Sequence, residues 1–188
     1  MTNTMKVGVS QATYKDLSSE RPRNVQFVPI DGRDDTAQIL WRRQGDRTAW
    51  AVGAIEQLTR LRWIHTDTAG VDRLPLDLIR HREILLTNAR GAHTPAVSEW
   101  ALGAILLAAK NLHTTVRARD RHSWSPHRHD IQLRGSGIVI MGLGSIGSTV
   151  AGLCAALGMR VTGISRSGAP TEGAQRVLSS NDSWSEAL

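Results

Sequence analysis

The sequence predicts an α/β fold with parallel sheets, and two observations support this prediction. Short β-rich segments alternate with segments of helical periodicity between Lys6 and Asn88. A glycine-rich turn then stands between a further strand and a further helix, over residues 137–158. Because strands that alternate with helices pair in parallel, each part of the chain is expected to build an open α/β sheet.

Five strands are predicted in the first part of the chain, each bounded by polar residues, glycine or proline. They lie at residues 6–10, 25–30, 37–43, 62–66 and 83–88. Helical patterns run from Trp50 to Leu61 and around residues 75–81.

The second part of the chain begins with a long apolar periodicity. Apolar residues keep helical spacing from Val97 to about Arg119, which predicts one long helix. The polar stretch after it contains Pro126 and is expected to form a loop. A second α/β unit then begins, with strands at residues 137–141, 160–164 and 174–178. We therefore expect two domains, residues 1–94 and residues 95–188.

Composition bounds the class of protein. The net charge of +6 raises nucleic acid as a partner, but the cations are interleaved with acids and only 4% of residues are aromatic. We expect a solvated basic surface and no nucleic-acid partner. The longest apolar run, residues 101–109, falls far short of the roughly 20 residues that cross a bilayer. The single cysteine, Cys154, lies in an apolar helical stripe, so we expect a packing role, a cytoplasmic location and no membrane partner.

The glycine-rich turn predicts a dinucleotide site. Gly142, Gly144 and Gly147 form G-x-G-x-x-G between a β-rich strand and a helical stripe, and Gly158 is placed to cap that helix. In this motif one glycine permits the tight turn, one lets the pyrophosphate approach, and one lets helix and strand pack closely. The predicted cofactor-binding residues of the loop are Gly142, Leu143, Gly144, Ser145, Ile146 and Gly147. A packing turn in another kind of α/β protein is the alternative.

The end of the next strand bears on the choice of cofactor. An NAD site usually places an acid there, about 20 residues after the glycines, to accept from the ribose 2′-hydroxyl. This chain has Ser165, Arg166 and Ser167 instead. A guanidinium and two hydroxyls suit a 2′-phosphate, so NADP(H) is favoured over NAD(H). The alternative is a solvent-facing arginine that selects neither.

Three stretches taken together resemble the D-isomer-specific 2-hydroxyacid dehydrogenases. They are HTDTAGVDRL at residues 65–74, TNARGAHTPAVSEWALGAILLAAKNL at residues 87–112, and the glycine-loop unit with the segments before it. The resemblance implies a flavodoxin-like substrate domain, a long crossover helix and the first part of a Rossmann domain. It also implies hydride transfer between NAD(P) and a small 2-keto or 2-hydroxy acid, such as glyoxylate or hydroxypyruvate, in a homodimer.

The resemblance assigns further site residues. The stretch TAGVD matches the family's substrate-carboxylate loop, which points to Ala69, Gly70 and Val71, although an ordinary turn that needs Gly70 is the alternative. Thr94 matches a residue near the cofactor, or else it is only a helix cap followed by Pro95. Glu99 is expected in the first helical turn, in a structural role.

No catalytic residue is assigned. The family's base, a histidine, with its orienting glutamate and a catalytic arginine, follows the glycine loop in the second half of the Rossmann domain. The chain is therefore expected to be truncated within that domain and inactive alone. Arg90 precedes the glycine loop and is not taken for the catalytic arginine. His122, His127 and His129 lie in a polar loop and are not expected to bind metal.

Two other functions remain open. One is a non-catalytic, regulatory dinucleotide-binding module or a degenerate enzyme, which would bind cofactor without turnover. The other is a basic nucleic-acid binder with an α/β fold, which would show steeply salt-dependent binding.

Overall fold

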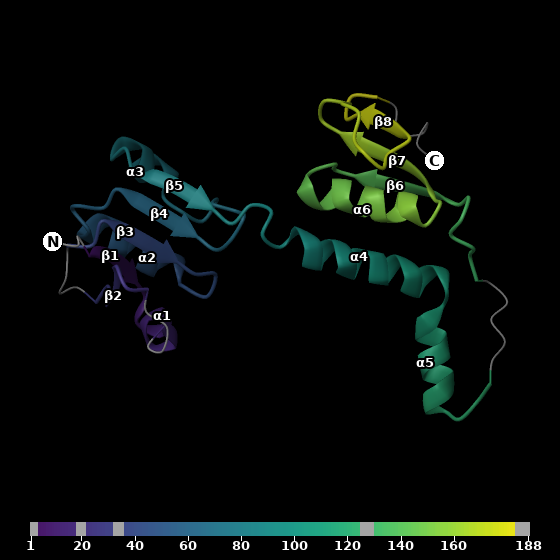
Figure 1. The fold of residues 1–188 in the computed structure, drawn as a ribbon, viewed down its shortest axis with the longest axis horizontal. Coiled ribbons are helices and arrows are strands. Elements are labelled where there is room, and N and C mark those ends of the chain that lie inside the picture. Colours follow the sequence, from purple (N-terminus) through teal and green to yellow (C-terminus); the bar gives the residue numbers. More distant parts are fainter. Residues whose placement is uncertain (1–3, 18–21, 32–35, 125–129, 183–188) are drawn as a thin grey trace. The chain divides into compact units, whose positions relative to one another are not determined.

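The computed structural model describes residues 4–17, 22–31, 36–124 and 130–182. The chain forms two compact units, residues 1–90 and residues 91–188 (Figure 1). Each unit has its own parallel sheet and its own apolar core.

The first unit is a five-stranded parallel sheet in the order β2-β1-β3-β4-β5, which is the flavodoxin-like order. Its strands are β1 (Met5–Val9), β2 (Val25–Pro29), β3 (Ile39–Arg42), β4 (Trp63–Thr66) and β5 (Leu85–Asn88). Its helices are α1 (Gln11–Asp16), α2 (Thr48–Gln57) and α3 (Leu76–His81).

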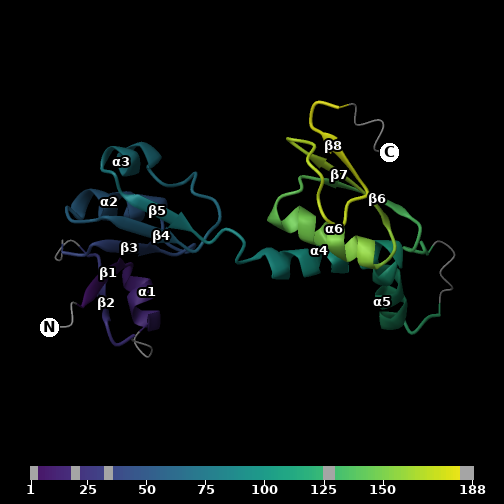
Figure 2. The same cartoon turned by 45° about the horizontal axis from the view of Figure 1, so that its top comes forward.

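Helices cover both faces of this sheet, with α2 and α3 on one side and α1 on the other (Figure 2). Successive side chains along a strand point to opposite faces of the sheet, so neighbouring residues of one strand pack in different clusters. On β3, Leu40 lies in the core under α2 and α3, whereas Ile39 and Trp41 lie in the cluster that contains Tyr14 of α1. Because all five strands are parallel, their carboxyl ends lie at the same edge of the sheet. The loops that follow them can share a site there.

The second unit has a three-stranded parallel sheet in the order β6-β7-β8. Its strands are β6 (Gly137–Met141), β7 (Arg160–Ser165) and β8 (Arg176–Ser179), and its helices are α4 (Thr94–Ala109), α5 (Leu112–Asp120) and α6 (Ser145–Ala156). The core joins Val150 and Cys154 of α6 to Val161 of β7 and Ala109 of α4. The helix α6 thus contacts both the sheet and α4.

The predicted α/β class is confirmed, with a flavodoxin-like sheet in the first unit and a Rossmann-like strand, turn and helix in the second. The single helix expected from Val97 to Arg119 is wrong. It divides into α4 and α5 at Asn111, which takes a left-handed conformation with φ 47°. Asparagine adopts this conformation more readily than most residues, and it interrupts the ladder of helical hydrogen bonds there.

The end of α6 follows the prediction for Gly158. Gly158 has φ 78°, and its N–H donates to the carbonyl of Ala155 at 2.8 Å. The N–H of Met159 donates to the carbonyl of Cys154 at 3.1 Å. These two bonds are those of a Schellman motif, which ends the helix and leads directly into β7.

The helices in the described part of the chain include none that is both long enough and apolar enough to cross a bilayer.

Candidate dinucleotide and substrate sites

The glycine loop, defined here as residues 142–147, leaves β6 and enters α6. Gly142 has φ 93°, a conformation that side chains disfavour, and its N–H donates to the carbonyl of Ile164 on β7 at 2.8 Å. Gly144 is the N-cap of α6 and is extended, with φ −76° and ψ −166°. The loop is therefore fixed to the end of the neighbouring strand before the helix begins.

Gly147 lies where no side chain fits. A Cβ atom built there would lie within 1.9 Å of the carbonyl oxygen of Gly142 and 3.4 Å from Ile140 on β6. At Gly144, by contrast, an added Cβ would meet nothing within 4 Å. These are the environments expected for close helix packing at the third glycine and for an open approach to the backbone at the second.

Gly163 on β7 supports the same loop, and the sequence analysis did not identify it. A Cβ atom there would lie 2.3 Å from a methyl carbon of Leu143, so the Leu143 side chain packs directly on the β7 backbone. The signal in the sequence was a glycine inside a strand, which often marks the close approach of another group.

The electrostatics of the glycine loop suit an anion. The first turn of α6 contains no acidic residue, and no side chain caps its N-terminus. Within the described chain, the backbone amides of residues 143–147 have no hydrogen-bond acceptor. Such amides, together with the positive end of the helix dipole, bind phosphate groups. The residues present therefore fit the pyrophosphate of a dinucleotide.

The three residues expected to contact the adenosine ribose follow β7. The Ser165 hydroxyl accepts from the N–H of Gly168 at 3.1 Å, and the Ser167 hydroxyl accepts from the N–H of Ala169 at 3.3 Å. Both hydroxyls keep their O–H available to donate. Arg166 is exposed and forms no ion pair with the residues that the structure describes.

The loop at residues 67–71 of the first unit links β4 to the turn before α3. The four consecutive carbonyls of residues 68–71 all accept hydrogen bonds from protein donors. Those of Thr68 and Val71 accept from the backbone N–H groups of Ala89 and Leu74, at 3.2 and 2.9 Å. That of Ala69 accepts from Asn88 Nδ2 at 2.7 Å, and that of Gly70 accepts from Thr68 Oγ1 at 2.8 Å.

The amides of the same loop are left open. Among the described residues, the N–H groups of Ala69, Gly70 and Val71 donate no hydrogen bond. Ala69 and Gly70 are exposed. Consecutive free amides form a concave site that favours an anion, so this loop can hold a carboxylate.

The structure tests one of the two roles predicted for Thr94, that of a helix cap. His93, not Thr94, is the N-cap of α4, and Thr94 is the first helical residue with Pro95 after it. The expectation that Thr94 caps the helix is therefore wrong, because Thr94 already belongs to α4. The expectation that Glu99 lies in the first turn is also wrong, since no acidic residue lies there. Arg90 is exposed, and its N–H donates to Asn88 Oδ1 at 3.3 Å.

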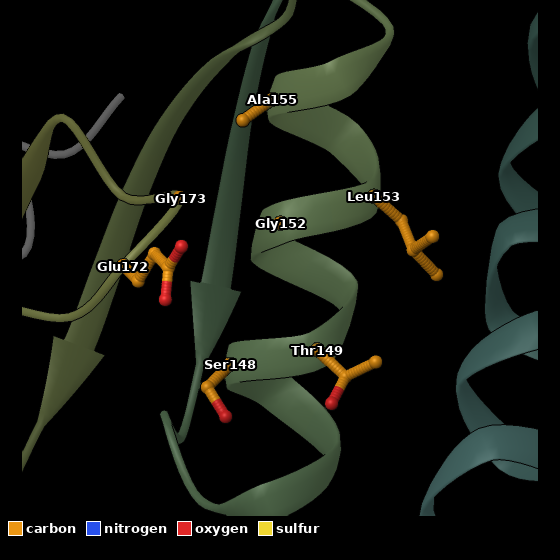
Figure 3. Close-up of a pocket in the computed structure, with 7 residues that line it drawn as sticks. All are labelled: Ser148, Thr149, Gly152, Leu153, Ala155, Glu172 and Gly173. Atoms are coloured by element: carbon orange, nitrogen blue, oxygen red, sulfur yellow. The ribbon is translucent and has the colours of Figure 1, made fainter.

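A pocket of about 560 Å³ lies beside α6, and none of the glycine-loop residues 142–147 lines it. Figure 3 shows Ser148, Thr149 and Gly152 on the helix, with Glu172 and Gly173 on the loop between β7 and β8. The Ser148 and Thr149 hydroxyls already donate to carbonyls of the first turn. With the carboxylate of Glu172 as the charged group of its lining, this pocket does not suit a phosphate.

The cysteine and histidines singled out in the sequence have these positions. Cys154 is fully buried in the core between α6 and β7, and burial raises the pKa of its thiol. The described residues contain no group of three or more His, Cys, Asp or Glu side chains that could hold a metal ion. His122 lies just after α5 with φ 50°, and His127 and His129 lie outside the described residues.

Known proteins resemble this chain both in sequence and in structure. Residues 102–188 match the model of the NAD-binding domain of D-isomer-specific 2-hydroxyacid dehydrogenases. A solved structure of a protein of that family from Aeromonas salmonicida covers 94% of this chain at 28% identity, with a TM-score of 0.75. Residues 102–188 of this chain therefore belong to the D-isomer-specific 2-hydroxyacid dehydrogenase family. The glycine loop is thus part of a nicotinamide dinucleotide domain.

Two curated relatives show the range of activities in the family. A D-3-phosphoglycerate dehydrogenase of Methanocaldococcus jannaschii is 30% identical over 68% of this chain and 24% of its own length. A glyoxylate reductase of Aeropyrum pernix is 34% identical over 60% of this chain and 36% of its own length. The chain also spans 58% of the solved Aeromonas salmonicida structure. The matched segments are therefore minor parts of the curated relatives.

Proposed function

We propose that this chain supplies the substrate-carboxylate loop and the dinucleotide loop of an NAD(P)-dependent oxidoreductase that interconverts a small 2-keto acid and its 2-hydroxy acid. Residues 1–94 are the proposed substrate domain, and residues 95–188 are the proposed crossover helix and first part of the cofactor domain. The observation that carries the proposal is the segregation of polar groups at residues 67–71. Carbonyls accept hydrogen bonds there, whereas three consecutive amides have no acceptor among the residues that the structure describes.

In the proposed reaction, a bound nicotinamide cofactor supplies or accepts a hydride at the C2 carbon of the substrate, while a proton is added to or removed from the C2 oxygen. The amides of Ala69, Gly70 and Val71 orient the substrate carboxylate. The amides of residues 143–147 hold the pyrophosphate of the cofactor, and Thr94 is proposed to lie near the cofactor. The reaction also needs a general base and a cation, and we propose that neither is among the residues named above.

The proposed division of labour predicts binding without turnover for residues 1–188. Purified chain mixed with NADPH and pyruvate or glyoxylate is expected to show no absorbance change at 340 nm beyond the enzyme-free rate. Turnover by this chain would contradict the assignment of the catalytic groups to another segment. Failure to bind any nicotinamide dinucleotide would contradict the proposed function itself.

The proposed preference for NADP(H) rests on the end of β7. Arg166 is exposed, makes no ion pair within the described part of the chain, and follows two strands that form a Rossmann-like pair. A guanidinium at this place can form charge-assisted hydrogen bonds with a 2′-phosphate, and no carboxylate occupies residues 165–167 to repel it.

We also propose a homodimer formed through the second unit. On α4, Ala101, Ile105 and Ala109 pack toward the core that contains α6. The opposite stripe of the helix leaves apolar side chains in solvent: Val97 is 40%, Trp100 is 76% and Leu107 is 46% exposed. A contiguous apolar stripe on a helix is typical of a protein contact. Sedimentation velocity of wild-type and Trp100→Glu chains tests this, since the substitution is expected to shift a dimer to monomer.

A cytoplasmic location is proposed from Cys154. The residue is buried, and it is the single cysteine of the sequence. A lone reduced cysteine in a core suits a reducing compartment.

A further inference from the structure

We infer that Thr66, Thr68 and Asn88 are positioning residues, which hold the backbone of residues 67–71 so that its free amides point to the substrate. This inference rests on the proposed function for the identity of the ligand. It concerns side chains that the sequence analysis did not identify.

The first part of the argument is a directional chain of hydrogen bonds. Thr68 Oγ1 lies 2.8 Å from the Gly70 carbonyl oxygen and 3.0 Å from Thr66 Oγ1. A carbonyl can only accept, so the Thr68 hydroxyl donates to Gly70. A hydroxyl has one proton, and therefore Thr66 must donate to Thr68.

This chain of hydrogen bonds begins in the interior of the first unit. Thr66 is fully buried, and Arg42 is only 4% exposed. Arg42 Nη1 lies 3.5 Å from Thr66 Oγ1, where the guanidinium can only donate. The proton of the Thr66 hydroxyl is thereby directed away from the arginine and toward Thr68. Each member of the chain fixes the direction of the next, so the end at Gly70 has one arrangement.

Asn88 adds a second, independent constraint from β5. Its Nδ2 donates to the Ala69 carbonyl at 2.7 Å, while its Oδ1 accepts from the Arg90 N–H at 3.3 Å. The same side chain therefore joins the 67–71 loop to the segment that follows β5. Nineteen residues separate Asn88 from Ala69, which makes this a tertiary contact.

The two constraints decide which way the peptide planes face. In a trans peptide the carbonyl and the following N–H point in opposite directions across the plane. When Asn88 and Thr68 hold the carbonyls of Ala69 and Gly70, the N–H groups of Gly70 and Val71 are turned to the other side. Without these donors the two peptides can rotate, and an anion must then restrict that motion when it binds.

The test compares Thr68→Val with Thr68→Ser in residues 1–188. Serine keeps the hydroxyl, whereas valine keeps the shape and removes it. Backbone NMR relaxation reports the order parameters of the N–H groups of Ala69, Gly70 and Val71, and titration with pyruvate reports carboxylate binding at the same amides. We expect Thr68→Val to lower these order parameters from about 0.85, the value of rigid backbone, toward about 0.6 and to weaken pyruvate binding about tenfold. Thr68→Ser should stay within about twofold of the wild-type affinity.

Two further variants keep the inference testable if Thr68→Val is poorly folded. Asn88→Ala removes the donor to Ala69 and is expected to lower the order parameters of the same amides. Thr171→Val removes a threonine hydroxyl that donates to the carbonyl of Ala169 in the second unit, and it should leave residues 69–71 unchanged.

The possible results separate this inference from the proposed function. If Thr68→Val and Asn88→Ala leave both the order parameters of residues 69–71 and pyruvate binding as in wild type, the positioning role is wrong. If both variants lower the order parameters but pyruvate changes no amide chemical shift of the wild-type loop, the positioning role holds and the substrate assignment fails.

Discussion

The 67–71 loop and the glycine loop each follow a parallel strand and each leave consecutive amides without an acceptor in the described chain. They differ in how the backbone is held. At residues 67–71, side chains of Thr68 and Asn88 bind the carbonyls. At the glycine loop, the absence of side chains at Gly147 and Gly163 lets the helix, the loop and β7 pack together. A backbone that presents free amides can thus be held in place in two ways. Side chains can donate to its carbonyls, or glycines can let neighbouring elements pack closely against it.

The largest expected effect comes from Gly147→Ala, since its new methyl group would overlap the Gly142 carbonyl. We expect the free energy of unfolding to fall by about 3 kcal/mol, at the upper end of overpacking costs, because backbone must move. Gly152→Ala is the matched control on α6, where an added Cβ meets nothing within 4 Å. The control should gain up to about 1 kcal/mol from helix propensity. Urea unfolding of both variants measures the difference, and equal stabilities would refute the packing role.

Gly144→Ala is expected to separate stability from binding. Its φ of −76° suits alanine and the space around it is open, so unfolding should change by no more than the roughly 1 kcal/mol that alanine costs at an N-cap. The methyl group would occupy the approach to the backbone, and NADPH affinity should fall tenfold or more, or at least about 1.4 kcal/mol. Fluorescence titration measures the affinity. Unchanged NADPH binding would mean that the pyrophosphate lies elsewhere.

Arg166→Ala sharpens the choice of cofactor. Loss of a charge-assisted bond to a 2′-phosphate should weaken NADPH binding about tenfold while NADH binding changes less than about twofold. Arg160→Ala is the control, because Arg160 begins the same strand at its opposite end and is also exposed. An equal effect of Arg166→Ala on the two cofactors would favour a solvent-facing arginine without selectivity.

Ser148→Ala has the smallest expected effect and tests the contrast between the loops. The Ser148 hydroxyl lies 2.8 Å from the carbonyl oxygen of Gly144 and 3.2 Å from that of Ser145, and its one proton serves this turn of its own helix. Its removal should change unfolding by less than about 0.5 kcal/mol and leave NADPH affinity within about twofold. A loss as large as that of Gly147→Ala would show that hydroxyls also hold the glycine loop.

Much of the fold could be predicted from local pattern. The predicted strands are found, because β-rich segments between polar boundaries are a local signal. The helix α1 was not predicted, since six residues carry little periodicity, although Ser10 caps it by accepting from the Thr13 N–H at 3.3 Å. The break at Asn111 was missed because apolar spacing continues across it.

The candidate sites divide in the same way. The glycine loop has a fixed spacing that the sequence displays, so its residues could be named in advance. Thr68 and Asn88 could not, because their roles depend on contacts between strands that meet only in the folded sheet. Gly163 was visible as a glycine in a strand, but its partner Leu143 was not.

The most direct test of the account is an NADPH titration of residues 1–188 followed by backbone NMR. We predict saturable shifts of the amides of residues 143–147, with the amide of Gly142 less affected because it already donates to Ile164. If millimolar NADPH leaves the chemical shifts of all these amides unchanged while the protein remains folded, the glycine loop is not the cofactor site. That result would contradict the proposed function.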